Sequence, residues 1–144
     1  MKISIGSDHA GFEQKQQLAS YLRECGHEVI DCGPQTDERC DYPDYAKLVA
    51  KEVVTGACER GVLVCGTGIG MAIAACKIDG IRAANVINTQ FAALCREHND
   101  ANIVTLSGRF VSLEENKAIL DVFLSTEFGG GRHAGRVQKI MNLE

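Results

Sequence analysis

The sequence reads Gly61-Val62-Leu63-Val64-Cys65 near its middle and continues directly as Gly66-Thr67-Gly68-Ile69-Gly70, and this stretch decides the fold. The first half is apolar without alternation, which is typical of a strand buried on both faces. The second half places three glycines before a run of small apolar residues, which predicts a tight turn into a helix over residues 69–77. A buried strand that leads through such a turn into a helix is the repeating unit of α/β sheets.

The same alternation extends in both directions from this stretch. Short apolar runs predict further strands, and between them apolar residues recur at the i, i+3, i+4, i+7 spacing of helices. Strands are expected at residues 2–6, 28–32, 61–65, 82–87 and 102–106. Helices are expected around residues 18–25 and 46–53, over 69–77, 89–97 and 113–124, and after Gly129-Gly130-Gly131 as a last helix that ends near Asn142.

Five consecutive βα units with short connections predict a single α/β domain over residues 1–144, doubly wound in the Rossmann- or flavodoxin-like manner. Its sheet should have five parallel strands, with helices on both faces and a C-terminal helix. Folds of this kind bind ligands at the carboxyl ends of the strands. The loops after the first, third, fourth and fifth strands are therefore the places where a site is expected.

Composition and charge exclude several classes of protein. The chain has 144 residues, 45% of them hydrophobic and 24% charged, as is typical of a globular domain. Its net charge of −4 argues against nucleic acid or an anionic membrane as the main partner. The first residues lack the apolar length of a signal peptide, and no apolar run approaches the roughly 20 residues of a membrane span. We therefore expect a cytoplasmic protein.

The seven cysteines are scattered along the chain and include no Cys-x-x-Cys pair. This spacing argues against a disulfide framework and against a structural zinc site. Reduced thiols in a cytosolic protein fit the pattern better. No grouping of Asp, Glu and His has metal-ligand spacing either, so the sequence implies no metal.

The loop after the third strand has the features of an anion site. Gly66, Gly68 and Gly70 permit positive φ and let a ligand approach the backbone amides closely. The start of the following helix adds unpaired N–H groups and a partial positive charge, which can hold a phosphate or a developing oxyanion. The spacing is neither the Gly-x-Gly-x-x-Gly of dinucleotide-binding proteins nor that of a P-loop.

Cys65 lies just before this loop. The partial charge that attracts an anion also favours the thiolate form of a neighbouring cysteine, which would make Cys65 reactive. The competing interpretation is a small buried residue at a strand end, because free cysteines are among the most buried side chains. The residues alone leave these two interpretations equally open.

Two pairs of polar residues could contact a ligand. Asp8 and His9 follow the first strand, although Asp8 could be a helix N-cap and His9 a solvated loop residue. His98 and Asn99 directly follow the fourth expected helix, at a place where a histidine often interacts with the helix dipole and an asparagine often stops the helix. Both readings stay open for each pair.

Arginines gather near the C-terminal end of this otherwise acidic chain. Arg109 follows the fifth strand, and Arg132 and Arg136 open the last helix four residues apart. Residues at that spacing share a helix face, so these two could bind one phosphate dianion with forked hydrogen bonds. Two ordinary surface arginines are the alternative, and their position after three glycines favours phosphate.

Taken together, the motifs resemble those of the type B ribose-5-phosphate isomerase family, which includes the galactose-6-phosphate isomerase subunits. They occur in the family order from one end of the chain to the other. The matching stretches are Gly6-Ser7-Asp8-His9-Ala10-Gly11-Phe12, Asp41-Tyr42-Pro43, Cys65-Gly66-Thr67-Gly68-Ile69-Gly70, Gly80-Ile81-Arg82-Ala83, Arg96-Glu97-His98-Asn99-Asp100-Ala101-Asn102 and Gly129-Gly130-Gly131-Arg132-His133-Ala134-Gly135-Arg136-Val137.

The resemblance implies an aldose–ketose isomerase that needs no redox cofactor. Cys65 is similar to the family's catalytic base, which shuttles a proton between C1 and C2 of the open-chain sugar. Thr67 and the loop amides resemble the groups that stabilise the cis-enediolate, and His98 resembles the acid/base that opens the furanose ring. Asp8 resembles a contact to the sugar hydroxyls and Asn99 one near the reacting oxygens. The phosphate clamp of the family is matched by His9, Arg109, Arg132 and Arg136.

The resemblance also implies a homodimer, or a tetramer, in which one subunit completes the site of another. Cys65, His98, Arg132 and Arg136 occur together in this chain, which favours a homo-oligomer over the heteromeric galactose 6-phosphate enzymes. Conversion of ribose 5-phosphate to ribulose 5-phosphate is the leading interpretation. A hexose 6-phosphate such as allose or galactose 6-phosphate as substrate, a non-catalytic sugar-phosphate sensor and a flavodoxin-like flavin binder are the alternatives.

Overall fold

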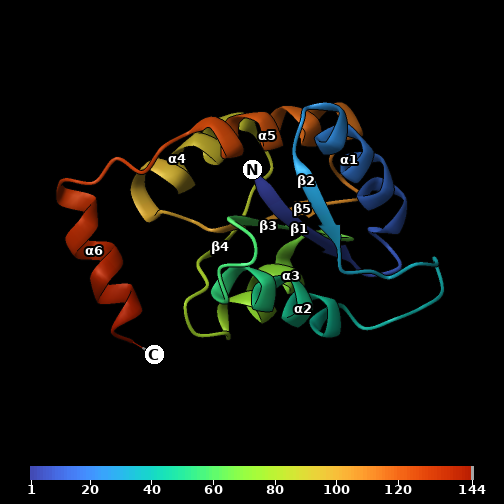
Figure 1. Ribbon diagram of the computed structural model, residues 1–144, viewed down its shortest axis with the longest axis horizontal. Coiled ribbons are helices and arrows are strands. Elements are labelled where there is room, and N and C mark those ends of the chain that lie inside the picture. Colours follow the sequence, from blue (N-terminus) through green and yellow to red (C-terminus); the bar gives the residue numbers. More distant parts are fainter. Residues whose placement is uncertain (144) are drawn as a thin grey trace.

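In the computed structural model, which describes residues 1–143, five parallel strands form one sheet with the order β2-β1-β3-β5-β4 (Figure 1). The centre of the sheet is β3, which contains the apolar stretch on which the fold prediction rests. Its neighbours are β1 and β5, and their registers pair Ser7 with Val64 and Ser107 with Cys65. The strands are β1 (Lys2–Ser7), β2 (Glu28–Asp31), β3 (Arg60–Cys65), β4 (Ala83–Asn85) and β5 (Ile103–Ser107).

Five helices cover the two faces of the sheet, and a sixth lies apart from it. α1, α4 and α5 pack on one face, and α2 and α3 pack on the other (Figure 1). The expected doubly wound α/β class is thereby confirmed. No helix within residues 1–143 is long and apolar enough to cross a membrane. The helices are α1 (Phe12–Glu24), α2 (Tyr42–Val54), α3 (Ile69–Cys76), α4 (Thr89–Asn99), α5 (Leu113–Ser125) and α6 (Arg132–Met141).

The strand order differs from the flavodoxin-like one at one edge. β5 lies between β3 and β4, whereas in flavodoxin-like sheets the fourth strand neighbours the third. β4 covers fewer residues than the expected 82–87, since at the edge of the sheet it has a single neighbouring strand and each of its side chains stays partly exposed. The N–H of Asn102 to the Arg82 carbonyl and the N–H of Val86 to the Thr105 carbonyl continue the pairing at its two ends.

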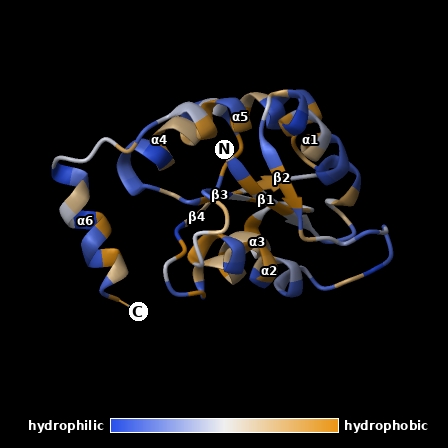
Figure 2. Ribbon diagram, viewed as in Figure 1, coloured by the Kyte–Doolittle hydropathy of each residue, from blue (hydrophilic) through white to orange (hydrophobic). Residues whose placement is uncertain are grey.

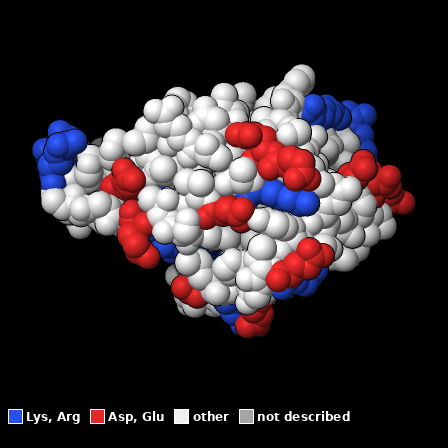
Figure 3. Space-filling view, turned by 90° about the horizontal axis from the view of Figure 1, so that it is seen from above, with Lys and Arg blue, Asp and Glu red and all other residues white. Residues whose placement is uncertain are grey.

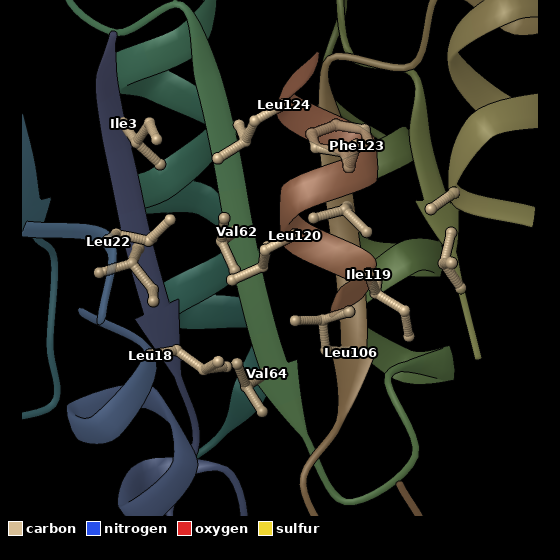
Figure 4. Packing of buried hydrophobic residues seen from close by; sticks show 14 of the residues in the cluster. Ile3, Leu18, Leu22, Val62, Val64, Leu106, Ile119, Leu120, Phe123 and Leu124 are labelled. Atoms are coloured by element: carbon tan, nitrogen blue, oxygen red, sulfur yellow. The ribbon is translucent and has the colours of Figure 1, made fainter. Parts of the chain in front are cut away.

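The hydrophobic core has one layer on each side of β3. Val62 and Val64 belong to the layer under α1, α4 and α5, and Leu63 and Cys65 belong to the layer under α2 and α3. All four side chains are at most 4% exposed, which confirms the predicted burial of this strand on both faces. Figure 4 shows the first layer, where Phe123 and its neighbours on α5 lie over the strands. Colouring by hydropathy shows the same concentration of apolar residues in the sheet (Figure 2).

α6 is the exception to this packing. None of its residues is buried, and the helix projects beyond the β4 edge of the sheet (Figure 1). It contacts α4, and Sδ of Met141 accepts a hydrogen bond from Nη1 of Arg82 at 3.2 Å. Its apolar side is left open, with Ile140 41% exposed. An amphipathic helix normally buries its apolar stripe against another element, and α6 does not do so within residues 1–143.

A buried ion pair fixes the first βα unit. Lys15 on α1 has no exposed surface, and its Nζ donates to the two carboxylate oxygens of Asp31 at 2.8 and 2.9 Å. Nζ also donates to the carbonyl oxygen of Pro34 at 2.8 Å. The ammonium group is thereby fully hydrogen-bonded, which is the condition for burying a charge without a large cost. The pair joins α1 to the end of β2.

Replacing Asp31 with Asn should lower the free energy of unfolding by roughly 3–5 kcal/mol, because the charge of Lys15 would stay buried without its partner. The matched control is Glu28→Gln on the same strand, which removes the exposed partner of Lys2 and should cost about 0–1 kcal/mol. Urea unfolding of the two variants and the parent measures both effects. Equal stability of the two variants would contradict the role given to the Lys15–Asp31 pair.

Candidate active site

The loop after β3 directs a backbone amide at the thiol of Cys65. Cys65 is the last residue of β3 and is only 4% exposed. The N–H of Gly68 donates to its Sγ over 3.1 Å, from a backbone with φ of +83° that favours glycine. α3 begins at the next residue, so the partial positive charge of its N-terminus lies at the same place. This arrangement stabilises negative charge on the sulfur.

Gly68 is tightly enclosed by the neighbouring strands. A Cβ at this position would overlap the side-chain amide of Asn85 and lie 3.0 Å from the backbone of Leu106. The Asn85 amide in turn donates to the carbonyl oxygens of Thr67 and Thr105, each at 3.3 Å, and holds the loop against β5. Asn85 was not among the predicted site residues. A polar residue at the carboxyl end of a strand is the signal that could have found it.

The loop after β5 supports the glycine loop from the other side. The N–H of Arg109 and the Oγ of Ser107 both donate to the carbonyl oxygen of Gly66, at 3.2 and 2.7 Å. The Arg109 side chain lies across Gly66, since a Cβ there would meet its Cδ and Nη1 at 3.5 Å. Thr67 is exposed at the tip of the loop, and its Oγ1 accepts a hydrogen bond from the N–H of Ile69 at 3.1 Å. Arg109 and Thr67 thus lie beside Cys65, on the same loops.

The ring of Tyr42, the first residue of α2, lies against Gly70. A Cβ at position 70 would be 2.8 Å from this ring, so a glycine is required for the close approach of the two segments. Tyr42 therefore borders the loop on the side of α2. No role at the site was predicted for it, because nothing in the sequence indicates that the start of α2 reaches the third strand's loop.

Asp8 and His9 follow β1, which pairs with β3. Asp8 is 7% exposed, and its Oδ1 accepts a hydrogen bond from the N–H of Gly11 at 3.0 Å, in the turn that leads into α1. This contact is close to the capping role considered above, and it leaves Oδ2 without a hydrogen bond within residues 1–143. His9 Nδ1 lies 3.2 Å from the carbonyl oxygen and 3.3 Å from the nitrogen of Cys40. The other ring nitrogen of His9 has no hydrogen bond within residues 1–143.

His98 and Asn99 lie at the opposite end of the strands, on the side of the sheet where the strands begin. α4 runs back from the end of β4 to the start of β5, and it ends at Asn99. The carbonyl oxygen of Asn99 accepts a hydrogen bond from Nε of Arg82, which directly precedes β4. A five-residue strand such as β5 spans about 15 Å, so these side chains do not reach Cys65 of the same chain.

A cluster of ion pairs fixes the turn that follows them. Asp100 has φ of +47°, and its carboxylate accepts hydrogen bonds from Nη1 of Arg96 at 2.9 Å and from Nη2 of Arg82 at 3.0 Å. Arg96 is 2% exposed and also donates to the carbonyl oxygen of Ala101 at 2.6 Å. The backbone at the end of α4 is thereby held in place. No role was predicted for these three charged residues individually.

The first turn of α6 meets the end of α4. The rings of His98 and His133 are stacked, with centroids 4.4 Å apart and planes 17° apart. Arg132 and Arg136 are exposed on the same part of α6. Figure 3 shows positive charge gathered at the end of the molecule where α6 lies, apart from the mixed charges elsewhere on that face. Burial, and then the proximity of His98, Arg132 and Arg136, lowers the pKa of His133.

The predicted site residues therefore form two groups within one chain, one at the carboxyl ends of the strands and one at their amino ends. No three His, Cys, Asp or Glu side chains gather as metal ligands among residues 1–143. We call the group at the ends of β1, β3 and β5 the carboxyl-edge group; it consists of Asp8, His9, Cys65, Gly66, Thr67, Gly68, Gly70 and Arg109. We call the group at the end of α4 and the start of α6 the amino-edge group; it consists of His98, Asn99, Arg132 and Arg136.

Residues 3–140 match the family model described as ribose/galactose isomerase. The chain belongs to this family. A probable ribose-5-phosphate isomerase B from Mycoplasma pneumoniae is 48% identical over 143 residues, which cover 99% of this chain and 94% of that protein. Ribose-5-phosphate isomerase B from Escherichia coli is 46% identical over 143 residues, which cover 99% of this chain and 96% of that protein.

Solved structures of ribose/galactose isomerases share the fold. Ribose-5-phosphate isomerase B from Clostridium thermocellum superposes with a TM-score of 0.98 at 50% identity, covering 99% of this chain and 97% of that one. The Mycoplasma genitalium enzyme, solved with bound ribulose-5-phosphate, superposes with a TM-score of 0.95 at 43% identity, covering 99% and 95%. The likeness thus extends over nearly the whole chain.

Gly68→Ala should lower the free energy of unfolding by roughly 1–3 kcal/mol, because a side chain is strained at positive φ and the Asn85 amide would be displaced. Gly135→Ala on α6 is the matched control: its Cβ would meet open space within a helix, so that change should be neutral or stabilising by up to about 1 kcal/mol. Thermal unfolding of both variants measures the difference. A Gly68→Ala protein as stable as the parent would refute the constraint.

Proposed function

We propose that this member of the ribose/galactose isomerase family interconverts ribose 5-phosphate and ribulose 5-phosphate through a cis-enediolate. The observation that carries the proposal is the 3.1 Å hydrogen bond from the Gly68 amide to the Cys65 thiol at a helix N-terminus. A sulfur stabilised in this way can act as the base that moves a proton between C1 and C2. The similarity to enzymes named ribose-5-phosphate isomerase B, one of them solved with ribulose-5-phosphate, supports the choice of substrate.

The carboxyl-edge group supplies the proton transfer. The thiolate of Cys65 removes a proton from one carbon and returns it to the neighbouring carbon. Between these two proton transfers, negative charge develops on the carbonyl oxygen of the sugar. The amides of the loop, with Thr67, donate hydrogen bonds to this oxygen beside the N-terminus of α3. Asp8, with its second oxygen free, accepts hydrogen bonds from the sugar hydroxyls and fixes the sugar against the base.

The amino-edge group supplies the remaining steps. His98 opens the furanose ring by moving a proton to the ring oxygen, and Asn99 donates to the oxygens at C1 and C2. Arg132 and Arg136 bind the phosphate with charge-assisted hydrogen bonds, together with His9 and Arg109 of the carboxyl-edge group. The phosphate lies at the other end of the sugar from C1 and C2. The energy gained by binding it helps to hold these reacting carbons in place.

These roles require two copies of the chain, because the two groups lie at opposite ends of the strands of one sheet. A homodimer with a twofold axis lets the carboxyl-edge group of one subunit meet the amino-edge group of the other. The surface around the β4 edge supports this proposal. Apolar side chains that are 51–78% exposed gather on α3, on α4 and in the adjoining loops, and α6 buries none of its own residues. The exposed side chains are Ile69, Ile73, Ile87, Phe91 and Phe110.

Cys65→Ala should lower kcat for ribose 5-phosphate by roughly 10²–10⁴-fold, the usual contribution of a general base, with loss of C1 proton exchange into solvent. Cys95→Ala is the control, because burial raises the pKa of Cys95 to about 11 and keeps that thiol protonated. NMR in deuterated water and a coupled assay measure both variants. Unchanged turnover would exclude Cys65 as the base, and a parent that prefers a hexose 6-phosphate by kcat/KM would assign the alternative substrate.

Mixing two inactive variants tests the shared site. Cys65→Ala and His98→Ala subunits should each have little activity alone, yet a mixed dimer contains one site with both groups intact. Random reassociation should therefore restore roughly a quarter of the parent's activity, given twofold symmetry. The measurement is turnover after unfolding and refolding the two variants together, with each variant refolded alone as the control. Activity that stays at the level of the single variants would mean that each site belongs to one chain.

A further inference from the structure

The His98 ring is oriented by a ring rather than by a hydrogen bond. Its contact is the parallel stack on His133, at a centroid distance of 4.4 Å and an interplanar angle of 17°. Within residues 1–143 neither of its nitrogens has a hydrogen-bond partner. His9 is different, since the backbone of Cys40 holds its Nδ1. An imidazole that must meet a particular oxygen of the sugar needs some contact to set its orientation, and for His98 the stack is that contact.

The backbone of His98 is already fixed independently of this stack. Asp100, two residues further on, bonds the buried Arg96 and also Arg82. Nε of Arg82 donates to the carbonyl oxygens of Asn99 and Asp100, at 3.2 and 2.9 Å. These contacts come from Arg82, which precedes β4, and from Arg96 on α4 itself. They leave the side-chain torsions of His98 as its remaining freedom. The ring stack restricts them.

His133 is held in place by backbone contacts within the start of α6 and between that segment and the end of α4. Its N–H donates to the carbonyl oxygen of Gly130 at 2.9 Å, in the first turn of α6. The N–H of Gly129 donates to the carbonyl oxygen of Glu97 at 3.0 Å and ties the chain to the residue before His98. A Cβ at position 129 would lie 3.0 Å from that Glu97 oxygen and 3.6 Å from Cδ2 of His133. The absence of a side chain at Gly129 therefore lets the segment before α6 lie close to the end of α4, next to the two histidines.

The charges around the stack favour an uncharged partner ring. Arg132 and Arg136 on α6 and Glu97 and His98 on α4 face His133. Burial, His98 and the two arginines lower the pKa of His133, and the smaller opposing effect of Glu97 does not reverse this direction. A neutral ring can stack on His98 without adding a further positive charge beside it. His98 can then accept and release the proton that ring opening requires.

We infer that His133 is a positioning residue, which holds the imidazole of His98 in the orientation needed to open the sugar ring. The inference rests on the proposed function. Ring opening breaks the bond between C1 and the ring oxygen, places a proton on that oxygen and removes one from the C1 hydroxyl, so that an aldehyde and a C4 hydroxyl result. No oxidant or other reactant is involved.

The chemistry of the two sugars separates ring opening from enolisation. Ribose 5-phosphate is mostly a furanose and must be opened before its C2 proton can be removed. Ribulose 5-phosphate stays open-chain, because its O5 is esterified and cannot close a furanose on C2. Exchange of its C1 proton with solvent therefore needs Cys65 and the loop amides but needs neither His98 nor His133.

The experiment compares His133→Ala and His133→Phe with the parent, and Gln138→Ala on an exposed part of α6 is the matched control. Turnover of ribose 5-phosphate and C1 deuterium exchange of ribulose 5-phosphate are measured on the same samples. His133→Ala should lower turnover by on the order of tenfold or more, given the roughly 10²–10⁴-fold worth of general acid–base catalysis, while exchange stays within about twofold of the parent. His98→Ala should show the same split. His133→Phe keeps a ring to stack on His98 and should restore most of the turnover.

Three results would overturn the inference. Parent-like turnover of His133→Ala would remove any role for the stack. An equal loss of turnover and exchange would assign His133 to folding or to phosphate binding. A His133→Phe variant as slow as His133→Ala would show that ring stacking is not what matters. A parent that exchanges no C1 proton of ribulose 5-phosphate would instead refute the proposed function, so the two failures are distinguishable.

Discussion

In a parallel sheet each helical crossover returns the chain from the carboxyl end of one strand to the amino end of the next. This constraint divides the polar residues of the predicted site into two groups, which we call the carboxyl-edge and amino-edge groups. Residues that follow a strand, such as Cys65 after β3, lie at the carboxyl edge. Residues that end a helix, such as His98 on α4, lie at the amino edge. The core of the sheet stands between them, so the length of a strand separates Cys65, the proposed base, from His98, the proposed ring opener, within one chain. The proposed dimer resolves this separation without any change to the fold.

In the carboxyl-edge group, the backbone N–H groups that can stabilise an anion are held in position by the protein itself. Gly68 takes a backbone conformation that side chains avoid, and this conformation turns its N–H toward the Cys65 sulfur. Asn85 from β4 and Ser107 from β5 then hold the loop by its carbonyl oxygens. The hydrogen bonds of the loop are therefore fixed in advance, which is what electrostatic stabilisation of an enediolate requires.

Much of this could be predicted from the sequence, because the signals were local. The unbroken apolar run at residues 61–65 indicated a central buried strand, and the glycines after it indicated the turn. The position of β5 beside β3 could not be predicted, since the periodicity of a strand does not reveal its neighbour in the sheet. The contacts of Asn85, the Lys15–Asp31 pair and the stack of His98 on His133 join residues distant in the sequence, so they depend on the three-dimensional arrangement. The role of α6 was only partly foreseen, because helical spacing predicts which residues share a face but not what covers that face.

The central claim is that one site is formed by the carboxyl-edge group of one subunit and the amino-edge group of its partner. A crystal structure with bound ribulose 5-phosphate tests it most directly. The account predicts C1 and C2 of the sugar beside the Cys65 sulfur of one subunit, with the phosphate on Arg132 and Arg136 of the other. A sugar phosphate bound wholly by residues of a single chain would contradict it.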